Sequence, residues 1–438
     1  MMAGLKANVL ALLPIAAIFF ITSCATLRDL NDKGVVDREG HIAIDNRSYK
    51  IPDLKTPVLL DENHGWIRNY KNVLSGFYSL YQPEVVYVKG DEYPYKMWFM
   101  GWAHTFLNKP DTLADGSYYP GHNGVNGGDA IFFARAKTLD EWQVYSRKRN
   151  GTGEVYWDEN QQTADWVPVL TSQGDTWFDD LHVGDPSVIY MNGTFYMAYS
   201  AMGTDKKNPS EPYPWSDNAA CIMGATSKDG IHWTRSKEPL MIWGKEYGFN
   251  EMNQKAFYYG GYQRPALLLE DGKWRMWFDH EAGSKNKISI GYAENAGDFL
   301  NSRSWKRISG DTTPVLTQFV DVDVVKIGSI YYAYGDPFVE WHHVKDKAIT
   351  DSDNGWSGRQ IVEAQSYDGI NWKITGYFKP DPGYPANQIP QVFLDHENKR
   401  VCIFYATQRG KRQSKEYDWK WDNFRYMYKE LKAYEDSK

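Results

Sequence analysis

The sequence predicts an all-β fold, a five-bladed β-propeller with four-stranded antiparallel blades around a central funnel. Two repeated patterns and one absence support this prediction. A strand, a turn and an aromatic-rich strand occur together five times, and an Asp-Gly turn before Trp follows the third strand in two of these copies. No stretch before the last part of the chain shows helical periodicity of useful length. Four-strand units repeated around an axis form propellers.

Length and composition exclude several classes of protein. The chain has 438 residues, a net charge of −7 and 42% hydrophobic residues, which excludes disordered and fibrous proteins. Nucleic acid is not expected as a partner, because phosphate binding needs clustered Lys and Arg. Three cysteines are too few for a disulfide scaffold. The 18 Trp, 31 Tyr and 19 Phe exceed what one core needs, and aromatic rings are common on binding surfaces.

The N-terminus has the features of an export signal. Lys6 precedes an apolar run from Val9 to Ile21, which is too short to cross a bilayer comfortably. The run ends in Ile-Thr-Ser-Cys24, which resembles the lipobox of bacterial lipoproteins. We therefore expect a signal peptide at 1–23, a tether or N-terminal extension at 24–60 and the propeller at 61–438. Lipidation of Cys24 would hold the exported protein on a bacterial membrane, periplasmic or at the cell surface; the alternative is an ordinary cleaved signal.

The five copies of the first pattern each begin with Pro or its equivalent and a run of mostly apolar residues. In four of them a glycine falls seven residues after this Pro or its equivalent (Pro83, Pro186, Pro265 and Asp321), where two paired strands need a hairpin turn. The copies run from Gln82 to Phe99, Asp185 to Tyr196, Arg264 to Phe278, Asp321 to Tyr332 and Ile389 to Tyr405, with the glycines at Gly90, Gly193, Gly272 and Gly328.

The second pattern is a turn that closes the third strand. Residues 227–233 and 366–372 share the string Ser-x-Asp-Gly-Ile-x-Trp. Asp229 and Asp368 are predicted to cap these turns through side-chain bonds to backbone amides, a structural role. Degenerate copies follow the third strands of two other blades, near residues 138–142 and 298–305.

Propeller geometry predicts where the functional side chains meet. The inner strand of each blade starts beside the axis, and its hairpin partner ends on the same face. Several carboxylates aimed at one cavity raise each other's pKa and suit acid and base catalysis on a neutral, hydroxylated substrate. The candidates at strand starts are Gln82, Glu84, Asp185, Arg264, Asp321, Asp323 and Gln391, and those at strand ends are Trp102, His104, His280 and Glu281.

The Asp185-Pro-Ser-Val-Ile strand start, the blade count and the Asp-Gly-x-x-Trp corners resemble the five-bladed glycoside hydrolases of families 32, 43, 62, 117 and 130. The resemblance covers roughly residues 75 to 410. It implies that an Asp at one strand start acts as base or nucleophile and that a second Asp tunes a pKa or orients the sugar. A Glu, or a His in family 117, is the acid.

This resemblance assigns roles to particular residues. Asp185 matches the Asp-Pro position, whereas the first blade has Gln82 there, and an amide cannot act as a base. Either Glu84, two residues further on the same strand face, replaces it, or the catalytic set is rotated among the blades. Asp321 occupies the acidic strand start of the fourth blade, and a bulge there would alter how Asp321 and Asp323 face.

The resemblance also implies an acid and substrate-binding side chains. Glu281 is the expected acid, with His280 as its rival. Arg264 is an expected substrate clamp or carboxylate partner. Further substrate contacts are expected from Gln82, Trp102, His104, His280, Asp323 and Gln391.

The sequence therefore predicts a glycoside hydrolase acting on plant or algal poly- or oligosaccharides. One alternative is a non-catalytic surface glycan-binding lipoprotein, favoured by Gln82. The other is a glycoside phosphorylase, which needs cationic residues such as Arg264 to seat phosphate. No cofactor or transition-metal site is expected, although the resemblance allows a structural Ca²⁺ in the central channel.

Overall fold

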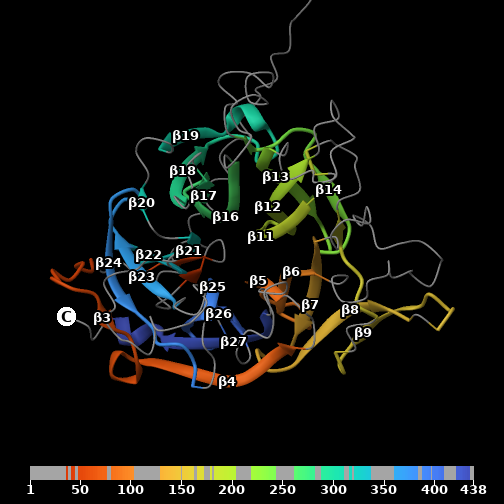
Figure 1. Cartoon of the computed structure of the whole chain (residues 1–438), viewed down its shortest axis with the longest axis horizontal. Helices are drawn as coiled ribbons and strands as arrows, with labels where there is room; N and C mark the ends of the chain where they lie inside the picture. Colours follow the sequence, from red (N-terminus) through yellow and green to blue (C-terminus); the bar gives the residue numbers. More distant parts are fainter. Residues whose placement is uncertain are drawn as a thin grey trace, which may run out of the picture.

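The computed structural model describes the chain as a disc of five blades around one axis (Figure 1). Cys24 and His104 lie outside the described residues. The described ranges are 36–37, 41–44, 48–75, 80–102, 129–148, 150–161, 165–171, 178–179, 182–203, 219–242, 261–281, 288–309, 315–317, 320–336, 360–382, 387–395, 397–408 and 421–434.

The first two blades follow each other along the chain, each with its inner strand first. Blade one consists of β5 (Leu80–Tyr87), β6 (Tyr95–Trp102), β7 (Asp129–Ala136) and β8 (Trp142–Arg147), with β9 (Val155–Asp158) and β10 (Leu170–Thr171) at its edge. Blade two consists of β11 (His182–Met191), β12 (Thr194–Gly203), β13 (Ala219–Ser227) and β14 (Trp233–Arg235), with β15 (Met241–Ile242) beside β13.

The remaining blades repeat this order. Blade three consists of β16 (Gly261–Glu270), β17 (Lys273–Glu281), β18 (Ile288–Asn295) and β19 (Lys306–Ser309), with β20 (Leu316–Thr317) beside β18 and the 3₁₀ turn η6 (Ser302–Ser304) before β19. Blade four consists of β21 (Val320–Ile327), β22 (Ile330–Asp336), β23 (Val362–Ser366) and β24 (Trp372–Tyr377). Blade five consists of β25 (Asn387–Asp395), β26 (Arg400–Gln408), β27 (Trp421–Glu430) and β4 (Trp66–Ser75), followed by η7 (Leu431–Tyr434).

Two features close the ring. The inner strands β5, β11, β16, β21 and β25 each contact the next, and β25 contacts β5 again. The outermost strand of blade five is β4, which comes from the N-terminal side of the chain and pairs with β27 (Figure 1). The all-β five-bladed prediction is therefore confirmed.

The segment expected as a tether or extension at 24–60 is, where described, built into the sheet of blade four. It contains β1 (Val36–Asp37), β2 (Ile42–Ile44) and β3 (Val58–Leu59), followed by η2 (Glu62–His64). β2 pairs in parallel with β21, and β3 pairs in parallel with β24. This part of the segment is an extension held by backbone hydrogen bonds, and it is not a free tether.

The core consists of five apolar clusters, one between each pair of neighbouring blades. Large aromatic side chains supply much of each cluster, and Trp98 and Trp277 are fully buried. The high aromatic content therefore serves mainly to fill the wedge between blades, where large rings bury much apolar area.

The Asp-Gly corners fasten neighbouring blades together. Asp229 accepts hydrogen bonds from the backbone amides of Ile231 and His232, and Asp368 does the same for Ile370 and Asn371. These bonds hold the pKa of Asp368 at about 2, below its usual range, despite the opposing effect of burial. The predicted capping role is confirmed.

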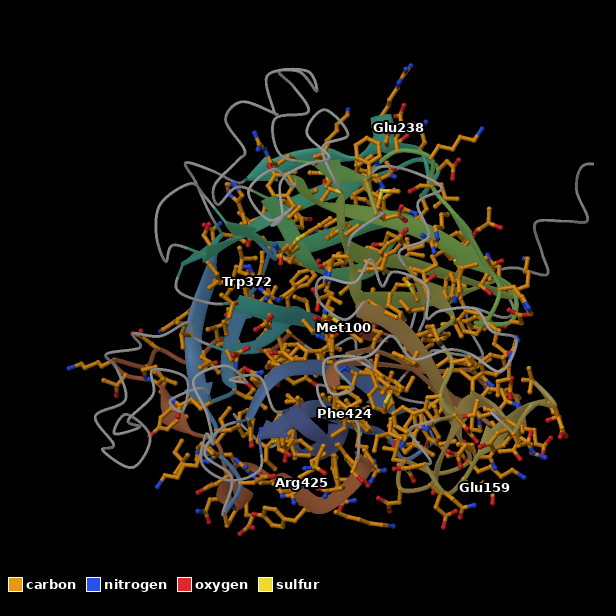
Figure 2. All side chains as sticks on the ribbon, turned by 45° about the vertical axis from the view of Figure 1, so that its right-hand side comes forward. Met100, Glu159, Glu238, Trp372, Phe424 and Arg425 are labelled. Carbon is orange, nitrogen blue, oxygen red and sulfur yellow. The ribbon has the colours of Figure 1, made fainter. Side chains whose placement is uncertain are left out.

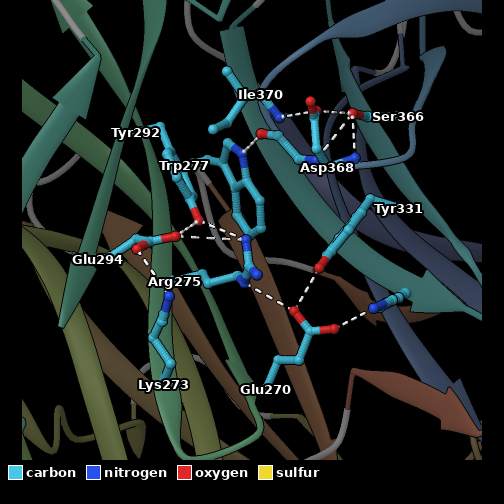
Figure 3. A network of polar contacts seen from close by, with 12 residues as sticks. Glu270, Lys273, Arg275, Trp277, Tyr292, Glu294, Tyr331, Ser366, Asp368 and Ile370 are labelled. Atoms are coloured by element: carbon cyan, nitrogen blue, oxygen red, sulfur yellow. Dashed lines mark hydrogen bonds and ion pairs between the residues drawn. The ribbon is translucent and has the colours of Figure 1, made fainter. Parts of the chain in front are cut away.

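The carbonyl of each corner glycine accepts a hydrogen bond from a tryptophan of the preceding blade. Trp98 Nε1 donates to Gly230 O at 2.9 Å, and Trp277 Nε1 donates to Gly369 O at 2.7 Å. Figure 3 shows Trp277 between the corner at Asp368 and a cluster of ion pairs around Glu270, which also receives the Tyr331 hydroxyl of blade four. Each corner thus stabilises its own turn and one blade interface.

Candidate functional site

Each inner strand contains a β-bulge near its start, at the same place in all five blades. The pairing register with the second strand shifts between Tyr81 and Glu84 in blade one, and at the equivalent positions in the other four. One residue of each bulge has a left-handed backbone with φ between 48° and 53°, a conformation that costs about 1–2 kcal/mol for a residue other than glycine. We call these five residues the left-handed ring: Gln82, Asp185, Arg264, Asp321 and Ile389.

The ring changes the alignment of blade four. The seven-residue spacing to glycine matched Asp321 with the prolines of the other blades. In the structure Asp321 takes the left-handed position equivalent to that of Asp185, and Val322 takes the place of proline. The hairpin of blade four has the same length as that of blade two, but Gly328 is the first residue of its two-residue turn, whereas Gly193 is the second.

The bulge also separates residues that alternation would place together. The pairs Tyr81–Met100 and Glu84–Trp98 leave two residues of β5 opposite one residue of β6. Simple alternation, on which the prediction of a shared face for Gln82 and Glu84 depends, is therefore interrupted between these two residues. Asp321 and Asp323 are separated in the same way.

Backbone amides of the left-handed ring bind side chains of the preceding blade. Arg264 N donates to Ser200 Oγ at 2.7 Å, Asp321 N to Asp279 Oδ1 at 3.2 Å, and Ile389 N to Asp336 Oδ1 at 3.3 Å. These bonds satisfy amides that the bulges remove from the sheet, and they explain how Ile389 can hold a conformation that is rare for a β-branched residue.

Blades one and five lack this acceptor, since blade five has Ala406 at the equivalent position and blade one has a methionine. The methionine is Met100, which lies near the middle of the molecule in Figure 2, far from the rim residues Glu159 and Glu238. The thioether packs against the backbone just before Asp185: a Cβ on Gly184 would lie 2.4 Å from Met100 Sδ. A side chain at position 184 would therefore require Met100 to move.

Arg264 joins two carboxylates of the site. Its Nη1 lies 2.9 Å from Asp279 Oδ2, and its Nε lies 2.6 Å from Asp321 Oδ1. Burial, together with repulsion from Asp321, raises the pKa of Asp279 to about 8, against the opposing effect of Arg264. Arg264 thus acts as a carboxylate partner across blades three and four.

Asp185 and Gln82 differ from these paired residues. Asp185 is 4% exposed, and its carboxylate has no hydrogen bond or ion pair within the described part of the chain. Gln82 is fully buried, and neither atom of its amide has a hydrogen-bond partner among the described residues. Polar groups left unpaired at low exposure are costly, and such groups mark sites where a ligand completes the bonding.

A second set of inter-blade bonds lies on the other side of the bulges. Glu84 Oε1 accepts from Val188 N at 2.8 Å, Ser187 Oγ accepts from Leu267 N at 3.0 Å, and Asp323 Oδ2 accepts from Val392 N at 2.7 Å. Gln391 occupies the same position in blade five and donates to Pro390 O at 3.0 Å. Glu84 and Asp323 therefore hold neighbouring blades together.

His41 lies on the propeller axis, a placement for which the sequence gives no signal. Its Nε2 is 3.7 Å from Glu84 Oε1 of blade one, its carbonyl accepts from Lys326 N of blade four, and its side chain is 1% exposed. Burial lowers the pKa of His41, against the opposing attraction of Asp323. A residue can reach inner strands of non-neighbouring blades only at the axis, so the extension fills the channel at this level.

The Glu84→Gln variant is expected to flatten the dependence of stability on pH. Burial raises the pKa of Glu84 to about 8 from its usual 4.5, so the folded chain holds a proton between these values that the unfolded chain releases. Stability therefore falls as pH rises through this window. Gln keeps the bond to Val188, so the variant should match wild type near pH 5 and gain roughly 2–4 kcal/mol near pH 9.

Urea unfolding at a series of pH values measures this effect. The exposed Glu141→Gln serves as the control and should follow wild type throughout. An equal gain at pH 5 and pH 9 would contradict a buried ionisation at Glu84.

The other predicted site residues are not part of the left-handed ring, and for some of them the structure does not describe the side chain or the whole residue. His280 is fully buried, with its ring centroid 5.1 Å from that of Tyr262. Trp102 and Glu281 are the last residues of β6 and β17, and the structure describes their backbones but not their side chains. His104 lies outside the described residues, as does the connection that follows the second strand of every blade.

The described residues contain neither a metal-type cluster nor a membrane-spanning helix. No cluster of three or more His, Cys, Asp or Glu residues there has the arrangement of a metal site. Within the same residues there is no helix with the length and apolar character needed to cross a membrane.

Comparison with solved structures identifies the fold. One structure described as a glycoside hydrolase shares 14% identity with a TM-score of 0.52, covering 84% of this chain and 92% of its own. A thermostable family-43 glycoside hydrolase has 14% identity and a TM-score of 0.49, covering 82% of this chain and 91% of its own. A family 117 glycoside hydrolase from the marine bacterium Zobellia galactanivorans has 12% identity and a TM-score of 0.47, covering 84% and 90%.

The chain thus has the fold of the five-bladed propeller glycoside hydrolases, as the sequence predicted. No protein-family model matches the chain, and a search of curated proteins also finds no match.

Proposed function

We propose that this protein is a glycoside hydrolase that acts on plant or algal poly- or oligosaccharides, with its site at the left-handed ring. The observation that supports this most directly is Asp185, an almost buried carboxylate without a partner in the described residues. It lies in the blade next to Gln82, whose amide is also unpaired. A sugar offers hydroxyl groups that could bond to both, and a positioned carboxylate supplies acid or base catalysis.

Asp321 would act as the second carboxylate of this site. Arg264 fixes its position and neutralises its charge through the 2.6 Å contact, so Asp321 and Asp185 differ in electrostatic environment. Different environments are what separates the roles of two catalytic carboxylates. Glu281, at the end of β17, remains the proposed acid. Glu84 is assigned a structural role instead of a catalytic one, because it accepts the hydrogen bond from Val188 N of the next blade.

The rival function is saccharide binding without catalysis. Gln82 favours it, because an amide stands at the strand start where blade two has a carboxylate. A phosphorylase is less well supported: the guanidinium of Arg264 already contacts both Asp279 and Asp321, which leaves it less able to seat a phosphate.

Product release tests the proposal. Residues 25–438 are incubated with a panel of plant and algal polysaccharides and their oligosaccharides, with and without phosphate, and products are measured by mass spectrometry. Free sugars in both conditions support hydrolysis. Phosphorylated sugars would show a phosphorylase, and binding to a glycan without any product would show a binding protein.

We further propose that the protein is exported and anchored to a bacterial membrane by lipid on Cys24, as the N-terminal sequence predicts. Incorporation of labelled palmitate in a bacterial host tests this proposal. Label that persists in Cys24→Ala would overturn it.

A further inference from the structure

A large pocket lies between the N-terminal extension and the outer strands of blades four and five. Its volume is about 1010 Å³, at the upper end of the range of ligand pockets. The walls come from residues 48–65, β22, β23, β24, β27 and η7, and none of the left-handed ring contributes. We call it the tyrosine pocket, and its main lining residues are Tyr49, Tyr332, Tyr434, Glu363, Gln365 and Lys429.

The polar side of the tyrosine pocket is built around Glu363. This carboxylate accepts hydrogen bonds from Thr375 Oγ1 at 2.8 Å, Gln365 Nε2 at 2.9 Å and Tyr334 Oη at 2.9 Å. All four side chains are buried in the fold. The position of the carboxylate is therefore fixed before any ligand arrives, which reduces the cost of binding.

Lys429 gives the pocket an unused donor. The residue is 9% exposed, and its ammonium forms no hydrogen bond or ion pair within the described residues. Its contact is with the Tyr434 ring, 4.3 Å from the centroid. Burial lowers the pKa of Lys429, with Glu363 opposing the shift. An ammonium in the pocket lining without a protein acceptor is available to a ligand oxygen, and hydrogen bonds from a charged donor are among the stronger ones.

The lining indicates the chemistry of the ligand. Lys429 and Glu363 carry opposite charges, which disfavours a ligand with several charges of one sign. Three tyrosines offer flat apolar surface with polar edges, and Lys429 and Gln365 supply polar contacts beside them. We propose that the tyrosine pocket binds a sugar unit of a saccharide chain, as a second site apart from the left-handed ring. This inference rests on the proposed function only in taking the same polysaccharide as its ligand.

The second site would hold a polymer while the ring acts on it. We therefore expect its loss to weaken binding of polysaccharide and to leave turnover of short oligosaccharides unchanged. Lys429→Met removes the donor and keeps the side-chain stem, whose Cε lies near Gly65. Lys432→Met is the matched control, because Lys432 is exposed on η7 and lies outside the pocket lining.

The experiment measures binding to a microarray of plant and algal glycans and then affinity electrophoresis in the polysaccharide that binds. Both variants are made in the Asp185→Asn background, so that hydrolysis does not consume the glycan while binding is measured. Lys429→Met should weaken binding about tenfold, the effect of one charged hydrogen bond, and Lys432→Met should not. Tyr49→Ala, which truncates a half-buried wall residue, should reproduce the loss if Lys429→Met fails to fold.

Equal binding by Lys429→Met, Tyr49→Ala and the control would overturn the second site and leave the proposed hydrolysis untouched. The second site would also be overturned if Lys429→Met weakened binding to none of the glycans on the array.

Discussion

Asp185→Asn is expected to lower release of sugars by roughly 10³-fold, the usual contribution of a positioned acid or base. The carboxylate is the unpaired one of the left-handed ring, and asparagine keeps its size without its charge or basicity. The backbone at Asp185 has φ of 48°, and asparagine is among the few residues that tolerate this conformation. The variant should therefore fold and bind as wild type does.

Asp271→Asn provides a matched control. Asp271 also has a left-handed backbone, with φ of 51°, but it lies in the exposed hairpin turn at the other end of β16. It should retain full activity. Thermal unfolding of both variants checks that the fold is intact.

The outcomes separate three conclusions. Loss of product from Asp185→Asn alone supports the assignment. Full activity in this variant would show that another carboxylate, such as Asp321 or Glu281, does the chemistry. If wild type and variant both release nothing yet bind the same glycan, the chain is a binding protein and Gln82 gives the physical reason.

Gly230→Ala is expected to destabilise the protein by about 3–5 kcal/mol, from backbone strain and overpacking together. Gly230 has φ of 78°, and a Cβ there would lie 2.7 Å from Cζ2 of Trp98 in blade one. Because Trp98 is fully buried and donates to the Gly230 carbonyl, it cannot move aside without losing that bond. The substitution therefore disturbs the blade interface as well as the turn.

Gly193→Ala separates the two causes. Gly193 has a similar φ of 72° in a hairpin turn, but nothing lies within 4 Å of a Cβ built there. Strain alone should cost about 1–2 kcal/mol. Urea unfolding measures both free energies, and Gly369→Ala, whose Cβ would lie 2.8 Å from Trp277, should resemble Gly230→Ala. Equal costs for Gly193→Ala and Gly230→Ala would rule out the interface contribution.

The repeats made the fold predictable because each blade needs the same turns. Hairpin glycines such as Gly193 and corner residues such as Asp229 are local requirements of a short turn, and they recur in the sequence for that reason. Because the repeats mark where each inner strand begins, the polar residues at these starts could also be recognised in the sequence. Asp185, Gln82 and Asp321 could be selected as candidates without coordinates.

The sequence pattern could not predict which side of the sheet the side chains of those residues face. Alternation places Glu84 on the face of Gln82, but the bulge interrupts the alternation between them, because two residues of β5 stand opposite one of β6. In three of the five blades the amide at the bulge donates to a side chain of the neighbouring blade, as Asp321 N does to Asp279. Such a bond joins residues 42 positions apart, beyond any local pattern.

The sequence by itself determined the strands, the turns, the number of blades and the residues that could carry chemistry, since these follow from short-range periodicity and backbone sterics. Tertiary structure decided which of them are free to act. It paired Arg264 with Asp321, assigned Glu84 to a blade interface and placed His41 on the axis. These outcomes depend on burial and on charges brought together from distant parts of the chain, which only the closed ring defines.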